Sequence, residues 1–215
     1  NPMGQRRQIS ICRFLFRREE WMKKRSHKLL GIYLAERYMD DATKACRKAF
    51  VFGCVEPDYN YASYLKGWGT GNRVKGHNYE CACHYIRKNA RYLSEKHTWN
   101  LWDYYQFGRM LHYLADAFTF PHNSHYEGTL ADHVRYELEM QPIFLEKLKD
   151  TAAQAVPVIG SRAGIVEELN RLHRDYRKQA SNPERDCDII LQTLCMAAAV
   201  FVPSAEYRHV QVCTN

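Results

Sequence analysis

The sequence predicts an all-α protein, and three observations support this. Apolar residues recur at the three- and four-residue spacing of amphipathic helices through most of the chain. No pair of alternating segments flanks a hairpin turn, so we expect no β-sheet. No uninterrupted apolar run reaches the roughly 18 residues that a membrane-spanning helix needs. With 215 residues, of which 46% are hydrophobic and 26% charged, the chain is sized for a single helical domain.

Three helices are expected in the first half of the chain, over residues 22–38, 42–52 and 77–95. The first of these has one apolar face, formed by Leu29, Leu30, Tyr33 and Leu34. Residues 53–76 are rich in Gly, Asn and Tyr and include Pro57, so we expect a loop there. A loop of this length in a compact domain is usually functional or disordered.

Four helices are expected in the second half, over residues 99–119, 130–150, 162–180 and 184–201. Thr98 is a suitable N-cap for the first of them, and Pro121 ends or kinks it. Pro183 stands near the start of the last helix and Pro203 stops it.

The formal net charge of +7 is confined to the first 28 residues. They carry nine Lys and Arg against two Glu, while the rest of the chain is neutral. We therefore divide the chain into a basic N-terminal leader over residues 1–21 and a helical domain over residues 22–215. The leader also contains large apolar residues such as Phe14, Phe16 and Trp21. It is predicted either to pack on the domain as a helix or to contact an anionic membrane surface or a partner.

We expect a cytoplasmic protein or one bound peripherally to a membrane, with secretion as an open alternative. Arg13, Arg17 and Arg18 interrupt any apolar stretch that could serve as a secretory signal within this sequence. A signal cleaved before Asn1 is compatible with the sequence. The eight cysteines permit disulfides, but a chain of this length does not need them, so we predict reduced thiols.

Histidines and carboxylates are concentrated in residues 110–139, MLHYLADAFTFPHNSHYEGTLADHVRYELE, among Leu, Tyr, Phe and Ala. His112 and Asp116 are four residues apart, as are His133 and Glu137, so each pair lies on one face of a helix. His122 lies in the connection between the two helices. A single pair of this kind is usually solvated at the surface, but two pairs and a third histidine in apolar surroundings need a partner for their charges. Imidazole and carboxylate are good zinc ligands, so we predict a metal site.

The order of these residues resembles the zinc-dependent phospholipase C family, which includes secreted bacterial lecithinases and the catalytic domain of clostridial alpha-toxin. The family pattern is His, Asp, His, then H-x3-D-x5-H, then H-x3-E. Residues 112–122, HYLADAFTFPH, and residues 133–137, HVRYE, match the last two motifs. The upstream members would be His27, Asp58 and His77. The resemblance implies a single all-α domain of the zinc-dependent phospholipase C and P1 nuclease type over residues 22–215.

The resemblance implies zinc ions clustered in one cleft. One ion would be held by Asp58, His77, His112 and Asp116, and a second by His122, His133 and Glu137. A third would take His27 and the other oxygen of Asp116. In the family an N-terminal Trp completes this third site, whereas residue 1 of this sequence is Asn. We therefore expect about two or three zinc ions.

By the same resemblance, the protein is expected to hydrolyse a phospholipid or another phosphodiester with a metal-activated water. Asp58 is the expected base, or the group that orients the attacking water. Aromatic residues in the same predicted loop are expected to bind substrate: Tyr59, Tyr61, Tyr64 and Trp68. Packing of these aromatic residues as core or lid is an equal alternative.

Two other functions stay open. The first is an S1/P1-like nuclease or a nucleotide phosphatase on the same metal scaffold. Nucleases of the S1/P1 type share much of the pattern, but their last motif is H-x3-D after a longer spacer, whereas His133 and Glu137 form H-x3-E eleven residues after His122. The neutral net charge of residues 29–215 also disfavours nucleic acid as the substrate. The second alternative is an inactive, metal-bound interaction protein, which the presence of Asp58 and His77 disfavours.

Overall fold

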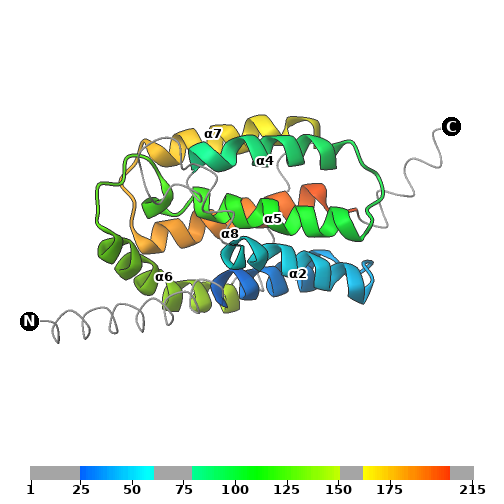
Figure 1. Ribbon diagram of the computed structural model, residues 1–215, viewed down its shortest axis with the longest axis horizontal. Coiled ribbons are helices and arrows are strands. Elements are labelled where there is room, and N and C mark those ends of the chain that lie inside the picture. The colour runs from blue at the N-terminus through cyan, green and yellow to red at the C-terminus, as the bar shows by residue number, and fades with distance from the viewer. Residues whose placement is uncertain (1–24, 61–78, 151–161, 204–215) are drawn as a thin grey trace, which may run out of the picture.

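The computed structural model describes residues 25–60, 79–150 and 162–203, and every regular element within these ranges is a helix (Figure 1). The all-α prediction is confirmed. In chain order the elements are a helix over residues 25–38, α2 (Lys44–Tyr59), α4 (Tyr79–Ser94), α5 (Leu101–Ala117), the 3₁₀ turn η1 (Phe120–His122), α6 (Leu130–Asp150), the 3₁₀ turn η3 (Arg162–Gly164), α7 (Ile165–Arg177) and α8 (Pro183–Phe201). Within the described ranges, no helix is both long and apolar enough to cross a lipid bilayer.

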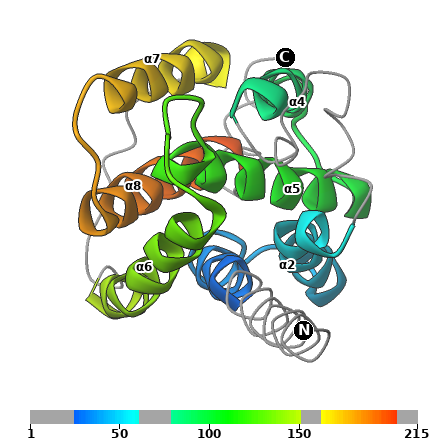
Figure 2. The same ribbon diagram turned by 60° about the vertical axis from the view of Figure 1, so that its left-hand side comes forward.

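Helix α5 lies at the centre of the molecule and packs against α2, α4 and α8 (Figure 2). Its last eight residues are all buried, as expected for a helix that is covered on every side. Phe107 anchors the core, with its ring centroid 5.6 Å from that of Phe50 on α2 and 5.8 Å from that of Phe201 on α8. Burial of each such ring stabilises the fold by about 2–3 kcal/mol. The same packing encloses His112 and Asp116, which lie on α5 beyond Phe107.

Helices α2 and α5 are in direct backbone contact at two glycines. A Cβ atom at Gly53 would lie 2.2 Å from the carbonyl oxygen of Tyr105, and one at Gly108 would lie 2.1 Å from the carbonyl oxygen of Phe50. Neither position has room for a side chain, so only glycine permits this approach. The contact brings the backbone of Cys54 next to α5, where it takes part in the site described below.

The predicted end of the second helix is wrong. Helix α2 does not stop at residue 52 but continues to Tyr59, so Asp58 lies on a helix rather than in a loop. Gly53 and Pro57 are local signals for a break. The packing of α2 against α5 outweighs these two signals, because the close backbone contact at Gly53 requires that residue to be helical. Residues 61–76 of the predicted loop lie outside the described residues.

The predicted N-cap of α5 is also wrong. The helix begins at Leu101, and its cap is Asn100 rather than Thr98. The Asn100 side-chain oxygen accepts hydrogen bonds from the backbone N–H groups of Trp102 and Asp103 at 2.9 and 3.1 Å. The Asp103 carboxylate in turn accepts the Asn100 N–H at 2.9 Å, which completes a capping box. Thr and Asn are both good caps, so the choice depends on this reciprocal bond.

The C-terminal half differs less from the prediction. Helix α6 spans residues 130–150 as expected. The single helix predicted over residues 162–180 is the turn η3 followed by α7, which ends at Arg177. Pro183 is the first residue of α8, and the side chain of its N-cap Asn182 accepts the Arg185 N–H at 2.9 Å.

We expect the substitution Asp103→Asn to lower the free energy of unfolding by about 2–3 kcal/mol at neutral pH. The buried carboxylate accepts hydrogen bonds from the Lys96 ammonium at 2.7 and 2.8 Å and from the Tyr92 hydroxyl at 2.8 Å, besides the Asn100 N–H. Burial by itself would raise the pKa of Asp103. The hydrogen bonds from Lys96, Asn100 and Tyr92, with the charge of Lys96, outweigh burial and lower this pKa below its usual value.

The sign of this shift predicts how the effect depends on pH. A carboxyl with a lowered pKa stabilises the folded state above its unfolded pKa of about 4, and this stabilisation is lost as pH falls through the folded pKa. Urea unfolding at pH 7 and at pH 3 should therefore show a smaller difference between wild type and Asp103→Asn at the lower pH. Glu95→Gln, a change at an exposed acid nearby, is the control. A difference that stays constant with pH would contradict the expectation.

Candidate metal centre

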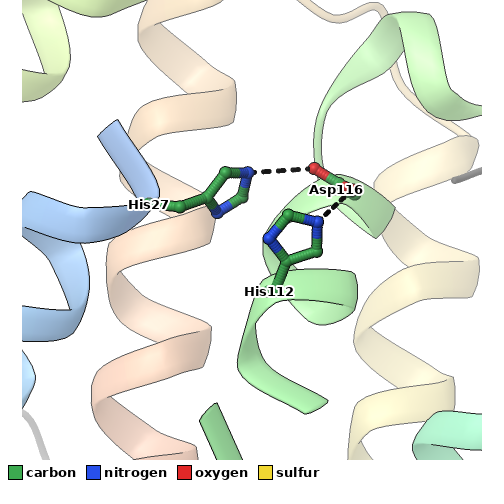
Figure 3. Close-up of side chains that lie close together, drawn as sticks. All are labelled: His27, His112 and Asp116. Atoms are coloured by element: carbon green, nitrogen blue, oxygen red, sulfur yellow. Dashed lines mark ion pairs between the residues drawn. The ribbon is translucent and has the colours of Figure 1, made fainter. Parts of the chain in front are cut away.

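A first cluster joins the helix over residues 25–38 to α5 through His27, His112 and Asp116 (Figure 3). The Nε2 atom of His27 lies 3.3 Å from Oδ1 of Asp116, and the Nε2 atom of His112 lies 3.3 Å from Oδ2 of the same carboxylate. The two imidazole rings lie beside each other, with centroids 4.0 Å apart. One buried carboxylate therefore presents each of its oxygens to a different histidine.

The orientation of His112 is set by the backbone of α2. Its Nδ1 atom lies 3.0 Å from the carbonyl oxygen of Cys54. A carbonyl only accepts hydrogen bonds, so Nδ1 carries a proton and donates it. In a neutral ring, Nε2 would then point a lone pair at two carboxylates, at 3.3 Å from Asp116 and 3.8 Å from Asp58. This geometry requires a proton or a metal ion at Nε2, and a backbone carbonyl on the other ring nitrogen is the usual support of a metal-binding histidine.

Asp58 lies in the last turn of α2, beside the first cluster. Its side chain is only 6% exposed. Its Oδ2 atom is buried and accepts no hydrogen bond from the described part of the chain. A buried carboxylate oxygen without a donor costs several kcal/mol, which a bound cation would offset. Asp58 therefore fits a metal centre better than it fits the protein core.

A second cluster joins η1 to α6 through His122, His133 and Glu137. Both histidines contact the same oxygen: Oε1 of Glu137 lies 3.2 Å from Nε2 of His122 and 2.8 Å from Nε2 of His133. Their rings are nearly perpendicular, with centroids 4.8 Å apart. The i, i+4 spacing places His133 and Glu137 on one face of α6, and the turn after α5 brings His122 to them.

The two clusters act on each other electrostatically. Burial disfavours the ionised form of Asp116, but the positive charges of His122 and His112, with hydrogen bonds from His112 and His27, hold the pKa of Asp116 well below its usual value. Burial disfavours the charged ring of His27, but Asp116 and the charge of Asp58 outweigh it and raise the pKa of His27. The charge of His122, from the second cluster, contributes to both groups. A metal ion at either cluster would compete with protons for the same ligand atoms.

The comparison with protein families agrees with this geometry. The sequence model of the family described as zinc dependent phospholipase C matches residues 26–182, well over half of the chain. The chain belongs to the zinc-dependent phospholipase C family. Neither the curated proteins nor the solved structures contain a match.

The donors of the centre suit zinc. They are imidazole nitrogens and carboxylate oxygens, and each cluster offers three of them with their ligand atoms within 4.8 Å of one another. Zinc binds such donors in four-coordinate sites, often with water or substrate in the remaining position. The zinc dependence of the family and the two His and carboxylate clusters therefore agree on the metal.

The structure describes most of the residues that the sequence analysis assigned to the site. It brings together six predicted ligands in two clusters, His27, His112 and Asp116 in the first and His122, His133 and Glu137 in the second. It places Asp58 beside the first cluster. Tyr59 ends α2 and is 59% exposed. The predicted ligand His77 and three predicted substrate-binding residues lie outside the described residues: Tyr61, Tyr64 and Trp68.

The carbonyl of Cys54 is the feature that sequence reasoning missed. Every residue carries such a carbonyl, so no side-chain pattern can identify it. The available signal was the pair Gly53 and Gly108, because glycine within a helical pattern often marks a close approach of two backbones. Their contact places the Cys54 carbonyl against His112.

Proposed function

We propose that this protein is a zinc-dependent phosphodiesterase of the phospholipase C type, acting on phospholipids with about two or three zinc ions bound. The observation that carries the proposal is the pair of His and carboxylate clusters, each with three potential ligand atoms within 4.8 Å of one another. A purely structural zinc site is usually closed by one set of four ligands. A centre with two sets of three donors suits the binding of a phosphate group between metal ions.

Bound zinc would neutralise the phosphate oxygens and lower the pKa of a water molecule toward about 7. We assign Asp58 as the group that orients this water and takes its proton. Its Oδ2 atom accepts no hydrogen bond from the described residues, so a lone pair of this oxygen can accept a proton from the water. The remaining proposed metal ligands hold the ions: His27, His77, His112, Asp116, His122, His133 and Glu137.

The proposed substrate is a phospholipid in a membrane or vesicle. The basic leader over residues 1–21 provides positive charge for peripheral contact with an anionic surface. The aromatic residues that follow Asp58 in the sequence are proposed to contact the lipid: Tyr59, Tyr61, Tyr64 and Trp68. The family match to a phospholipase C supports lipid rather than nucleic acid as the substrate.

The test combines metal content with activity. Protein purified without chelator is expected to contain about two or three zinc ions per chain by elemental analysis, and His122→Ala is expected to contain about one fewer. Wild type should release phosphorylated head groups from phosphatidylcholine vesicles, and EDTA should abolish this release. His125→Ala provides the matched control, because His125 is an exposed histidine three residues from His122.

The outcomes separate the possible functions. Zinc bound at the expected stoichiometry, with hydrolysis of single-stranded DNA but not of vesicles, would replace the lipid substrate by a nucleic acid. Zinc bound without either activity would indicate an inactive metal-bound protein. Absence of zinc from the wild type would overturn the proposed function as a whole.

A further inference from the structure

A buried carboxylate on α8 connects the segments that carry the second cluster. Asp186 is 0% exposed. Its Oδ2 atom accepts hydrogen bonds from the backbone N–H of Phe120 at 2.8 Å and from the Tyr136 hydroxyl at 2.7 Å. Its Oδ1 atom accepts the Tyr176 hydroxyl at 2.9 Å and the Ser181 hydroxyl. One side chain therefore ties together η1, α6, the end of α7 and the start of α8.

The two donors to Oδ2 stand next to metal ligands in the sequence. Phe120 is two residues before His122, in the same 3₁₀ turn, and Tyr136 directly precedes Glu137. The two segments also meet at the site itself, where Nε2 of His122 lies 3.2 Å from Oε1 of Glu137. A single oxygen of Asp186 thus bridges η1 and α6, through residues that adjoin the proposed ligands rather than through the ligand side chains.

A second restraint holds the other end of the same turn. The Asn123 side-chain amide donates to the carbonyl oxygens of Ala117 and Thr119 at 3.2 and 3.0 Å. Its Oδ1 atom lies 3.0 Å from Nε2 of His173, a buried residue of α7. Residues on both sides of His122 are therefore fixed from α7 and α8, which leaves the backbone of η1 little freedom.

The hydrogen-bond partners of Asp186 are all uncharged. Its oxygens meet a backbone N–H and three hydroxyl groups, and no ion pair to Asp186 is present among the described residues. A buried carboxylate without a cation costs more than a well-packed neutral group would. It does, however, offer two acceptor oxygens to four donors, which an apolar side chain could not. Asp186 therefore fixes the positions of its four donor groups, at some cost to the stability of the fold.

We propose that Asp186 is a positioning residue that holds His122 at binding distance from the α6 ligands His133 and Glu137. This inference rests on the proposed function, in which the second cluster binds zinc. Asp186 lies beyond residue 182, where the match to the family ends. Supporting groups of this kind typically change metal affinity by about 10- to 100-fold when they are removed.

Two hydroxyl deletions test the proposal on the full chain. Tyr136→Phe removes a hydrogen bond to Oδ2, which joins α6 to η1, whereas Tyr176→Phe removes one to Oδ1, which joins α7 to α8. Both variants lose one hydroxyl from the same carboxylate, so each controls for the stability cost of the other. Zinc affinity is measured by competition with a chromophoric chelator, and cobalt absorption reports the geometry of the bound ion.

We expect Tyr136→Phe to weaken the binding of one zinc ion about 10-fold and to alter the cobalt spectrum, while Tyr176→Phe leaves both unchanged. Asp186→Asn should bind zinc nearly as the wild type does, because the amide oxygen can still accept from Phe120 and Tyr136. Equal zinc affinities in the two Tyr variants would overturn the positioning role. Absence of zinc from the wild type would overturn the proposed function together with the positioning role. Failure of the positioning role alone would instead leave zinc binding by the wild type intact.

Discussion

Replacing Glu137 by glutamine is expected to remove about one zinc ion per chain and to lower kcat/KM for phospholipid by about 10³-fold. Oε1 of Glu137 is the oxygen that faces both His122 and His133, at 3.2 and 2.8 Å. Glutamine keeps the shape of the side chain but removes the negative charge that would hold a divalent ion between the two rings. Loss of one metal ion from a catalytic site removes several kcal/mol of transition-state stabilisation, and about 4 kcal/mol corresponds to 10³ in rate.

The matched control for this variant is Glu139→Gln. Glu139 lies on the same helix, two residues from Glu137, but is exposed and belongs to neither cluster. Elemental analysis and initial rates on phosphatidylcholine vesicles are measured for both proteins. Full zinc content and activity in Glu137→Gln, equal to those of Glu139→Gln, would show that the second cluster does not bind a catalytic ion.

Replacing Gly108 by alanine is expected to destabilise the fold by about 2 kcal/mol and to weaken zinc binding at the first cluster about 10-fold or more. The new Cβ would lie 2.1 Å from the Phe50 carbonyl oxygen and 2.9 Å from the Cys54 backbone nitrogen. These are backbone atoms of α2, so the whole helix must move away from α5. The roughly 1 kcal/mol gained from the helix propensity of alanine is smaller than this cost. Separation of the helices would break the hydrogen bond from His112 to the Cys54 carbonyl.

A second glycine provides the comparison for this prediction. A Cβ at Gly31 would lie 3.1 Å from the Cβ and Sγ atoms of Cys54, a tight contact that a shift of a few tenths of an ångström relieves, whereas the contacts at Gly108 are much shorter and are with backbone atoms. Gly31→Ala should therefore change the free energy of unfolding by less than about 1 kcal/mol and leave zinc affinity nearly unchanged. Urea unfolding of the metal-free proteins separates the stability effect from the metal effect. If Gly108→Ala bound zinc like the wild type, the backbone contact would have no part in arranging the site.

The helical fold and part of the site are evident from sequence because both depend on local spacing. A helix repeats every 3.6 residues, so the periodic apolar residues predict helices, and His133 and Glu137 must share a face wherever α6 lies. The same argument holds for His112 and Asp116. Helix ends are less certain, because several residues in a row can cap or break a helix. The end of α2 depends on packing at Gly53, and the start of α5 depends on the reciprocal bond of Asn100 and Asp103.

The contacts between distant segments were decided by tertiary packing. The spacing of residues along one helix cannot show that His27 faces Asp116, that the Cys54 carbonyl orients His112, or that Asp186 joins η1 to α6. These contacts depend on how closely two helices approach and at which register. Approach and register follow from side-chain volumes and backbone groups spread over the whole core. Local spacing thus predicts which residues can form a cluster, and helix packing determines which clusters form and what supports them.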